Sequence, residues 1–285
     1  MRMISSEALD IRVSDADLPI LSAVATRVLA LLGQGDPNIK ELEALVRLDP
    51  GLTSRILRLA NSPLYGGMVE FKSIEQAMVR LGVSALKQTV LIAATGEVFD
   101  GEDDFARSLW DHSIATAVTS QTIAEQVGGV STEEAFVAGM LHDIGKLIIY
   151  GQAENEYAEL EVEARTEGRR FFECEQENIQ YCTHETIGSL VGRKWCLAPD
   201  MLEVMRFHHV VERDESIAER SSRIVLVVSA ANILANQLGM GAEAPELMNV
   251  LESIPAAQLG LNEEMIENLT ETLPEIVSSQ KSAFQ

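Results

Sequence analysis

Apolar residues recur at three- and four-residue intervals along most of the chain, which is the period of an amphipathic helix. In the segment LPILSAVATRVLALL, residues 18–32, Leu21, Val24 and Val28 fall on one face. No segment shows the strict alternation of apolar and polar residues that is typical of a half-buried strand. The pattern therefore predicts an all-α fold.

Capping residues mark where several helices begin and end. Asp49 is a good N-cap for a helix that starts at the next residue. Ser73 with Gln76 has the spacing of a capping box, and Gly82 is expected to close that helix in a left-handed conformation. Later helices are expected at about 154–167, 184–195, 199–209 and 218–238, with two more within 245–280.

The helices fall into two groups, separated by the charge-rich stretch DGEDDF at residues 100–105, which predicts a loop. Short, well-capped helices precede it and longer helices follow it. The chain has 285 residues, which is enough for one large domain or two modest ones. Residues 1–14 lack the apolar core of a signal peptide and are expected to form an N-terminal tail. The organisation predicted is two-lobed.

Charge and composition narrow the function. The 44 acidic residues outnumber the 22 basic residues, so the net charge is -22 and the field repels phosphate backbones. No apolar run approaches the roughly 20 residues of a membrane helix. The three cysteines form neither a disulfide framework nor a zinc-ribbon pattern. We expect a cytoplasmic protein with protein or small-molecule partners, for which nucleic acid and membrane binding are both unlikely.

One segment keeps a DNA-binding hypothesis open. IKELEALVRLDPGLTSRILRLANSP superficially resembles a helix-turn-helix, in which Arg55 and Arg58 would face DNA. The alternative is that Leu52, Ile56 and Leu59 form a core and the arginines are solvated or paired with acidic neighbours. The acidic net charge favours this alternative.

Histidine is confined to the second lobe. The chain has five histidines: His112, His142, His184, His208 and His209. A single helical histidine is usually structural, but five in one lobe beside an aspartate suggest a metal site. Imidazole and carboxylate ligands suit zinc, iron, manganese or nickel.

The step His142-Asp143 is the centre of this hypothesis. Adjacent side chains point about 100° apart on a helix, so both can reach one centre only at a helix end. Gly145 is expected to give the backbone the freedom to turn there. Lys146 would offer a charge to a phosphate oxygen, and a bound metal would acidify water. The implied chemistry is phosphate-ester hydrolysis.

Several motifs, in order, resemble the bacterial HDOD (HD-related output domain) family. They include IKELEALVRLDPGLTSRILRLANSPLYG and SIEQAMVRLGVSALKQTVL in the first lobe, and AFVAGMLHDIGKL and THETIGSLVGRKWCLAPDM in the second. The resemblance covers about residues 15–212. It implies an N-terminal lobe of short helices (15–98) packed on an HD-like helical bundle (105–212), with residues 213–285 adding helices that complete the bundle.

The second lobe of this family resembles the HD-type phosphohydrolases, including the HD-GYP phosphodiesterases of cyclic di-GMP, which bind one or two metal ions. The resemblance assigns metal-ligand positions to His112, His142, Asp143, His184, His208 and His209. Lys146 matches the lysine that follows the His-Asp step in that pattern. If the protein were an enzyme, Asp143 and Lys146 would be its catalytic residues.

Two departures from the HD pattern weaken the enzyme interpretation. The final aspartate aligns best with Asn232, and the nearby Ser229 and Asn236 are not carboxylates either. A neutral amide binds a dication more weakly than a carboxylate does. The segment VVERDES also lacks the Asp-Gly-x-Gly-Tyr-Pro signature of HD-GYP enzymes.

The resemblance therefore implies a bacterial signal-transduction protein that acts through contacts with other signalling proteins. Its partly retained HD site would bind a divalent metal (Fe, Mn, Zn or Ni, one ion or two) or a nucleotide-type ligand. The alternative is a metal-dependent phosphohydrolase or phosphodiesterase acting on a nucleotide or cyclic dinucleotide. Whether any catalysis remains is open, and the departures favour a non-enzymatic role.

Overall fold

The computed structural model describes residues 18–32, 38–61, 71–95, 104–179, 183–241, 245–247 and 249–284. Helices make up most of these residues, and no strand occurs among them, which confirms the all-α prediction. The predicted tail at residues 1–14 and residues 100–103 of the predicted loop lie outside the described ranges. Asp104 and Phe105, the last two residues of that stretch, already belong to a helix.

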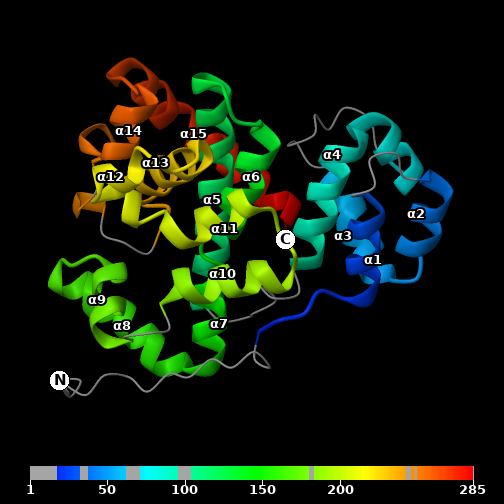
Figure 1. The fold of residues 1–285 in the computed structure, drawn as a ribbon, viewed down its shortest axis with the longest axis horizontal. Coiled ribbons are helices and arrows are strands. Elements are labelled where there is room, and N and C mark those ends of the chain that lie inside the picture. Colours follow the sequence, from blue (N-terminus) through cyan, green and yellow to red (C-terminus); the bar gives the residue numbers. More distant parts are fainter. Residues whose placement is uncertain are drawn as a thin grey trace. The chain divides into compact units, whose positions relative to one another are not determined.

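The chain divides into two compact units, one of Met1–Pro19 with Glu102–Glu271 and the other of Ile20–Gly101 with Thr272–Gln285. We call them unit 1 and unit 2 (Figure 1). The boundary at residue 271 falls inside the last helix, α15 (Glu263–Phe284). Unit 2 also contains α1 (Ala23–Leu32), α2 (Ile39–Val46), α3 (Pro50–Ala60) and α4 (Ile74–Thr95).

Unit 1 contains the remaining helices. In chain order these are α5 (Asp104–Val127), α6 (Thr132–Leu141), α7 (Ile144–Gln152), α8 (Glu154–Glu167), α9 (Phe171–Asn178), α10 (His184–Lys194), α11 (Pro199–Phe207), α12 (Glu215–Ala218), α13 (Arg223–Gln237) and α14 (Ile254–Leu259), with short 3-10 turns at Val210–Glu212, Pro245–Leu247 and Val250–Glu252. The helices expected near 154–167, 184–195 and 199–209 are confirmed. The helix expected at 218–238 begins later, at Arg223, because Ser221 and Ser222 separate it from α12.

In unit 2, helices α1, α2 and α3 pack against α4. The predicted cap is confirmed, since the Asp49 carboxylate accepts a hydrogen bond of 2.9 Å from the amide of Leu52 at the start of α3. Leu52 and Ile56 are buried on the inner face of this helix. Arg55 donates from Nε to the carbonyl of Ala93 at 2.8 Å and so ties α3 to α4. This bond occupies the Nε donor of Arg55 within unit 2.

The first arm of α4 ends in a kink at Gly82, as expected, but Gly82 does not adopt the predicted left-handed cap. Its φ is positive, at 79°, but its ψ of 173° is extended, so it does not form the left-handed cap. The helix bends at Gly82 and resumes directly. The Ser73 hydroxyl accepts from the amide of Gln76 at 3.2 Å, as the capping box requires, but the Gln76 side chain accepts from the amide of Lys72 instead of Ser73.

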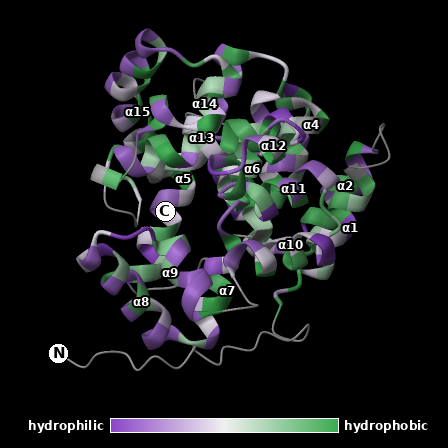
Figure 2. Cartoon of the chain, turned by 60° about the vertical axis from the view of Figure 1, so that its left-hand side comes forward, coloured by the Kyte–Doolittle hydropathy of each residue, from purple (hydrophilic) through white to green (hydrophobic). Residues whose placement is uncertain are grey.

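In unit 1, α5 packs against α6 and α13, while α10 packs against α7 and α11. The central helices are buried on all sides: every residue from Ala135 to Leu141 in α6 and from Ile224 to Asn236 in α13 is buried. Figure 2 colours α6 mostly as hydrophobic and the peripheral α8 mostly as hydrophilic. A helix that is buried all round shows no amphipathic stripe. Its polar residues therefore need partners inside the protein.

Gly145 allows α7 and α10 to approach each other closely. A Cβ atom at this position would lie 2.0 Å from the carbonyl oxygen of His184, which no real Cβ can do. The expectation that Gly145 lets the backbone turn is wrong, since Gly145 lies inside α7 and has no positive φ. The chain turns at His142 and Asp143 themselves, between α6 and α7. Gly145 instead fixes the distance between the His142-Asp143 turn and His184.

Among the described residues, no single helix is both long and apolar enough to cross a bilayer. The two arms of α4, Ile74–Val83 and Gln88–Ala94, reach that length and hydropathy only when they are taken together across a bend of 120°.

The formal net charge of the chain is carried entirely by unit 1. Unit 1 contains 35 acidic and 13 basic residues, and unit 2 contains nine of each, so the whole formal charge of -22 falls on unit 1. All five histidines also lie in unit 1.

Replacing Gly145 with alanine is expected to destabilise the protein, because the new methyl group would force α7 and α10 apart. We expect a loss of about 1–3 kcal/mol in the free energy of unfolding, measured by urea denaturation. Gly151→Ala is the matched control, since Gly151 lies in the same helix and a Cβ there meets nothing within 4 Å. This control should be neutral or stabilising, by up to about 1 kcal/mol. Equal effects of the two substitutions would contradict the close-approach role of Gly145.

Candidate metal centre

Asp143 is the centre of the histidine cluster. It is the N-cap residue of α7, yet its carboxylate makes no capping hydrogen bond and faces the interior of unit 1. The five histidines reach this carboxylate from different parts of the chain. His112 lies in α5, His142 follows α6, His184 begins α10, and His208 and His209 follow α11. All six side chains are buried.

One carboxylate oxygen, Oδ1, faces His184 and His208. It lies 3.3 Å from Nε2 of His184 and 3.5 Å from Nε2 of His208. The two Nε2 atoms lie 3.4 Å from each other. Together with a nitrogen of His209, these atoms form a group of four donors that all lie within 4.8 Å of one another.

The other oxygen, Oδ2, faces different partners. Nε2 of His142 lies 3.3 Å away and Nε2 of His112 lies 3.6 Å away. The Lys146 ammonium donates a hydrogen bond of 2.6 Å to the same oxygen. His112, His142 and Asp143 form a second group of donors, so the two groups share Asp143.

The outward ring nitrogen of every histidine lies against an oxygen acceptor. The Nδ1 contacts are His112 to the Met240 carbonyl (3.1 Å), His142 to the Gly139 carbonyl (2.7 Å), His184 to the Glu175 carboxylate (2.5 Å), His208 to the Val204 carbonyl (3.0 Å) and His209 to the Glu212 carboxylate (3.3 Å). A carbonyl oxygen only accepts, so the proton of a neutral imidazole belongs on Nδ1. The Nε2 lone pairs therefore point inward, as metal ligands require.

Three inward-facing atoms have no hydrogen-bond partner in the described part of the chain: Nε2 of His142, Oδ1 of Asp143 and Nε2 of His209. Oδ1 lies close to two Nε2 atoms but receives no proton from them, because lone pairs face lone pairs. A buried polar atom without a partner costs free energy. A cation on the Oδ1 side would satisfy Oδ1 of Asp143 and Nε2 of His209.

Burial keeps His112, His208 and His209 neutral, whereas Asp143 stays ionised because of its close partners. Desolvation lowers the pKa of His208 to about 3 and that of His112 to about 4, and it holds the pKa of His209 well below the ordinary value. Burial raises the pKa of Asp143, but His142 and Lys146 outweigh this effect and hold the pKa well below its ordinary value. Near neutral pH these are the protonation states that bind a metal ion.

Glu175 orients His184. Its Oε2 accepts from Nδ1 of His184, and its Oε1 accepts from the His184 backbone amide at 2.9 Å and from the Tyr157 hydroxyl at 2.6 Å. All three side chains are fully buried. Burial lowers the pKa of His184, but the Glu175 carboxylate outweighs this effect and raises it. A carboxylate bound to a histidine in this way increases the basicity of the ligand nitrogen.

The donor spacing on the Oδ1 side fits a tetrahedral ion. Ligands at 2.0–2.1 Å from a tetrahedral zinc ion lie about 3.3–3.4 Å from one another. The three measured separations among Oδ1 and the two Nε2 atoms are 3.3, 3.5 and 3.4 Å. The residues present therefore fit a metal ion, with His209 as the fourth donor of the group.

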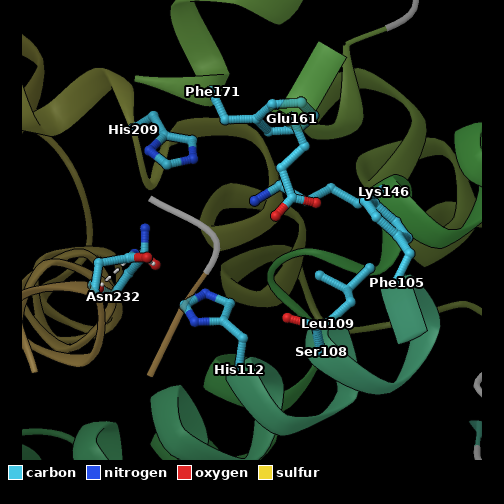
Figure 3. Close-up of a pocket in the computed structure, with 10 residues that line it drawn as sticks. Phe105, Ser108, Leu109, His112, Lys146, Glu161, Phe171, His209 and Asn232 are labelled. Atoms are coloured by element: carbon cyan, nitrogen blue, oxygen red, sulfur yellow. Dashed lines mark hydrogen bonds between the residues drawn. The ribbon is translucent and has the colours of Figure 1, made fainter. Parts of the chain in front are cut away.

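Asn232 and Lys146 line a pocket beside the cluster, together with His112, His209 and Glu161. In Figure 3 the side chains of His112, Asn232 and His209 surround one side of this space, and Glu161 with Lys146 lies across it. The Asn232 side-chain oxygen accepts from Nδ2 of Asn236 at 3.0 Å. Burial raises the pKa of Glu161, against the opposing effect of Lys146.

Sequence reasoning identified the residues around Asp143 but not their supports. Glu175 lies between the half-buried Glu173 and the exposed Glu177 of α9, and nothing in that pattern distinguishes a buried carboxylate. Glu185 was also missed, although burial raises its pKa to about 7. Its only sequence signal is its position next to His184.

Residues 18–211 match the model of the HDOD domain family. The chain is 25% identical to an HDOD domain protein with unknown function from Geobacter sulfurreducens, with a TM-score of 0.75 and coverage of 93% of both chains. It is 23% identical to a structure from Shewanella amazonensis SB2B named "Putative phosphohydrolase", with a TM-score of 0.72 and coverage of 95% of this chain and 96% of the other.

A curated relative is an uncharacterized protein from Treponema pallidum, which is 22% identical over 275 residues. The match covers 94% of this chain but 51% of the relative, so the chain spans about half the relative's length. The family model covers more than half of this chain and includes all five histidines and Asp143. The chain belongs to the HDOD family.

Proposed function

We propose that this HDOD protein is a bacterial signalling module that binds one divalent metal ion and acts through contacts with other signalling proteins. The ion would be held by Oδ1 of Asp143 with His184, His208 and His209. The observation that carries the proposal is the set of inward Nε2 lone pairs around Oδ1, each fixed by an acceptor on the outward Nδ1.

The residues on the Oδ2 side of Asp143 support the proposal that the protein binds a metal ion without efficient turnover of a substrate. Asn232 supplies a neutral amide where the HD pattern has a carboxylate, and its oxygen is already hydrogen-bonded to Asn236. Oδ2 of Asp143 is already paired with Lys146. A bound ion would supply Lewis acidity and an acidified water. The chain's own groups offer little further charge to position a phosphate beside it.

The charge distribution supports protein partners over nucleic acid. All of the net charge of -22 lies on unit 1, which also contains the candidate metal centre. Such a field concentrates divalent cations and repels phosphate-rich ligands. Partners with a basic surface would be favoured for the same reason.

A metal-dependent phosphohydrolase acting on a nucleotide or cyclic dinucleotide is the second candidate. It is supported by the full set of five histidines and by Lys146, which lines the pocket beside them. In this case Lys146 would hold a phosphate oxygen, and Asp143 would orient the reacting groups. The Phe105 and Phe171 side chains of the same pocket would contact an apolar part of the ligand.

The first prediction concerns metal binding. Protein purified without a metal-binding tag is expected to retain a divalent ion by elemental analysis. Adding the ion to chelator-treated protein should raise the unfolding free energy by about 2.7 kcal/mol at a hundredfold excess over Kd. His209→Gln should abolish most of this gain because it removes one of the four donors.

Cys196→Ser is the control for that experiment. Cys196 is an exposed thiol and the obvious site of incidental zinc binding. Its substitution should leave metal content unchanged. If this variant loses the ion and His209→Gln keeps it, the proposed centre is wrong.

The second prediction concerns Glu175. An amide at this position must turn its NH2 group either toward Nδ1–H of His184 or toward the His184 backbone amide, which are both donors. We expect Glu175→Gln to weaken metal affinity by about 10–100-fold, measured by competition with a chromogenic chelator. Glu177→Gln, in the same helix and paired with Arg169 at the surface, should have no such effect.

The third prediction separates the two candidate functions. Metal-loaded protein, incubated with a panel of nucleotides, cyclic dinucleotides and a chromogenic phosphodiester, is expected to show no turnover above the metal-only control. Rapid hydrolysis that disappears in Asp143→Asn would instead establish the phosphohydrolase and overturn the regulatory proposal.

A further inference from the structure

We propose that the Lys146 ammonium takes the place of a second metal ion, so that the centre holds one divalent ion although it has donors for two. This inference rests on the proposed metal centre and specifies how many ions it binds. The two donor groups share Asp143, one at each oxygen, and only the Oδ2 side has a resident cation.

The Lys146 ammonium beside Oδ2 opposes a second ion by charge repulsion. Nζ of Lys146 lies 2.6 Å from this oxygen, on the side that also faces His112 and His142. A metal ion bound to Oδ2 would lie about 2.0–2.2 Å from it. An ammonium and a dication that share one oxygen at these distances repel each other strongly in a buried site.

Lys146 is held in this position by several contacts. It lies one turn after Asp143, and its backbone amide donates to the Asp143 carbonyl at 2.9 Å. Its ammonium also lies 5.5 Å from the ring centroid of Phe171, a cation–π arrangement. Its side chain is only 8% exposed, so water does not replace these partners. Displacing the ammonium would leave a buried positive charge without its carboxylate.

The two histidines on this side differ, since Nε2 of His142 has no hydrogen-bond partner in the described residues and Nε2 of His112 has one close neighbour. Nε2 of His112 already lies 3.4 Å from the Thr116 hydroxyl. Asn232, which lines the adjoining pocket, adds no charge, so Asp143 is the only anion of this donor group. On the Oδ1 side, Oδ1 and Nε2 of His209 have no hydrogen-bond partner in the described residues, and the Lys146 ammonium is bound to the other oxygen.

The test is the number of ions bound by the full-length protein. Chelator-treated protein is loaded with excess Zn2+, desalted and analysed by mass spectrometry of the elements, and Co2+ is titrated in parallel by visible absorption. We expect one ion per chain for the wild type and for Lys146→Arg, which keeps the cation. Lys146→Met, which keeps the length of the side chain and removes its charge, should bind two ions.

A histidine variant identifies which side is filled. His112→Gln should leave one ion bound in the wild-type background but should remove the second ion from Lys146→Met. Two ions in the wild type, or one ion in a Lys146→Met protein that unfolds at the wild-type temperature, would overturn the inference. If Lys146→Met does not fold, the inference is still tested by the number of ions bound to the wild type and to His112→Gln, which should be one in each case. A wild type that binds no ion would instead refute the proposed metal centre itself.

Discussion

The whole of unit 1 is organised around a buried carboxylate faced by nitrogen lone pairs. In the described part of the chain, Lys146 donates a hydrogen bond to Asp143, while the Nε2 atoms on its Oδ1 side turn lone pairs toward it. Without a cation this arrangement is repulsive, and burial prevents water from relieving it. Its geometry persists because the outward Nδ1 atoms are each held by an acceptor that the helices supply. The fold therefore imposes the ligand orientation before any ion arrives.

This constraint explains features that local helix propensity does not. The α7–α10 contact at Gly145 brings the His142-Asp143 turn to His184 at a distance that any larger residue would prevent. Glu175 and Tyr157 are placed beneath His184 at the cost of burying a carboxylate and a phenol. Their hydrogen bonds satisfy each other, which is the condition for burying polar groups without loss of stability. Stability and site geometry thus depend on the same contacts.

The helices and the histidine cluster could be predicted from the sequence because each leaves a signal in it. Helices leave a periodic pattern of apolar residues, and the cluster leaves an uneven distribution of histidine. Five histidines confined to one lobe indicated a common centre, and apolar spacing indicated α10 and α11. The supports of the centre leave no such signal, because a buried Glu175 and an exposed Glu177 look alike within α9. The role of Gly145 was wrongly predicted as a turn, since sequence shows a glycine but not whether conformational freedom or close contact requires it. Gly82 kept its positive φ but not its predicted cap, because the chain after it returns to helix.

The neutral side chain of Asn232 and the positive charge of Lys146 both disfavour a second divalent ion beside Asp143. A carboxylate at position 232 would add a negative charge beside the pocket that Lys146 also lines, and two carboxylates there would favour a dication over an ammonium. With an amide in that position, a single positive charge balances Asp143 on the Oδ2 side. Two-metal hydrolysis needs ions on both sides of the reacting phosphate. If the centre holds one ion and one lysine, as proposed, the second ion that two-metal hydrolysis requires would be absent, and metal binding would be kept without that route to turnover.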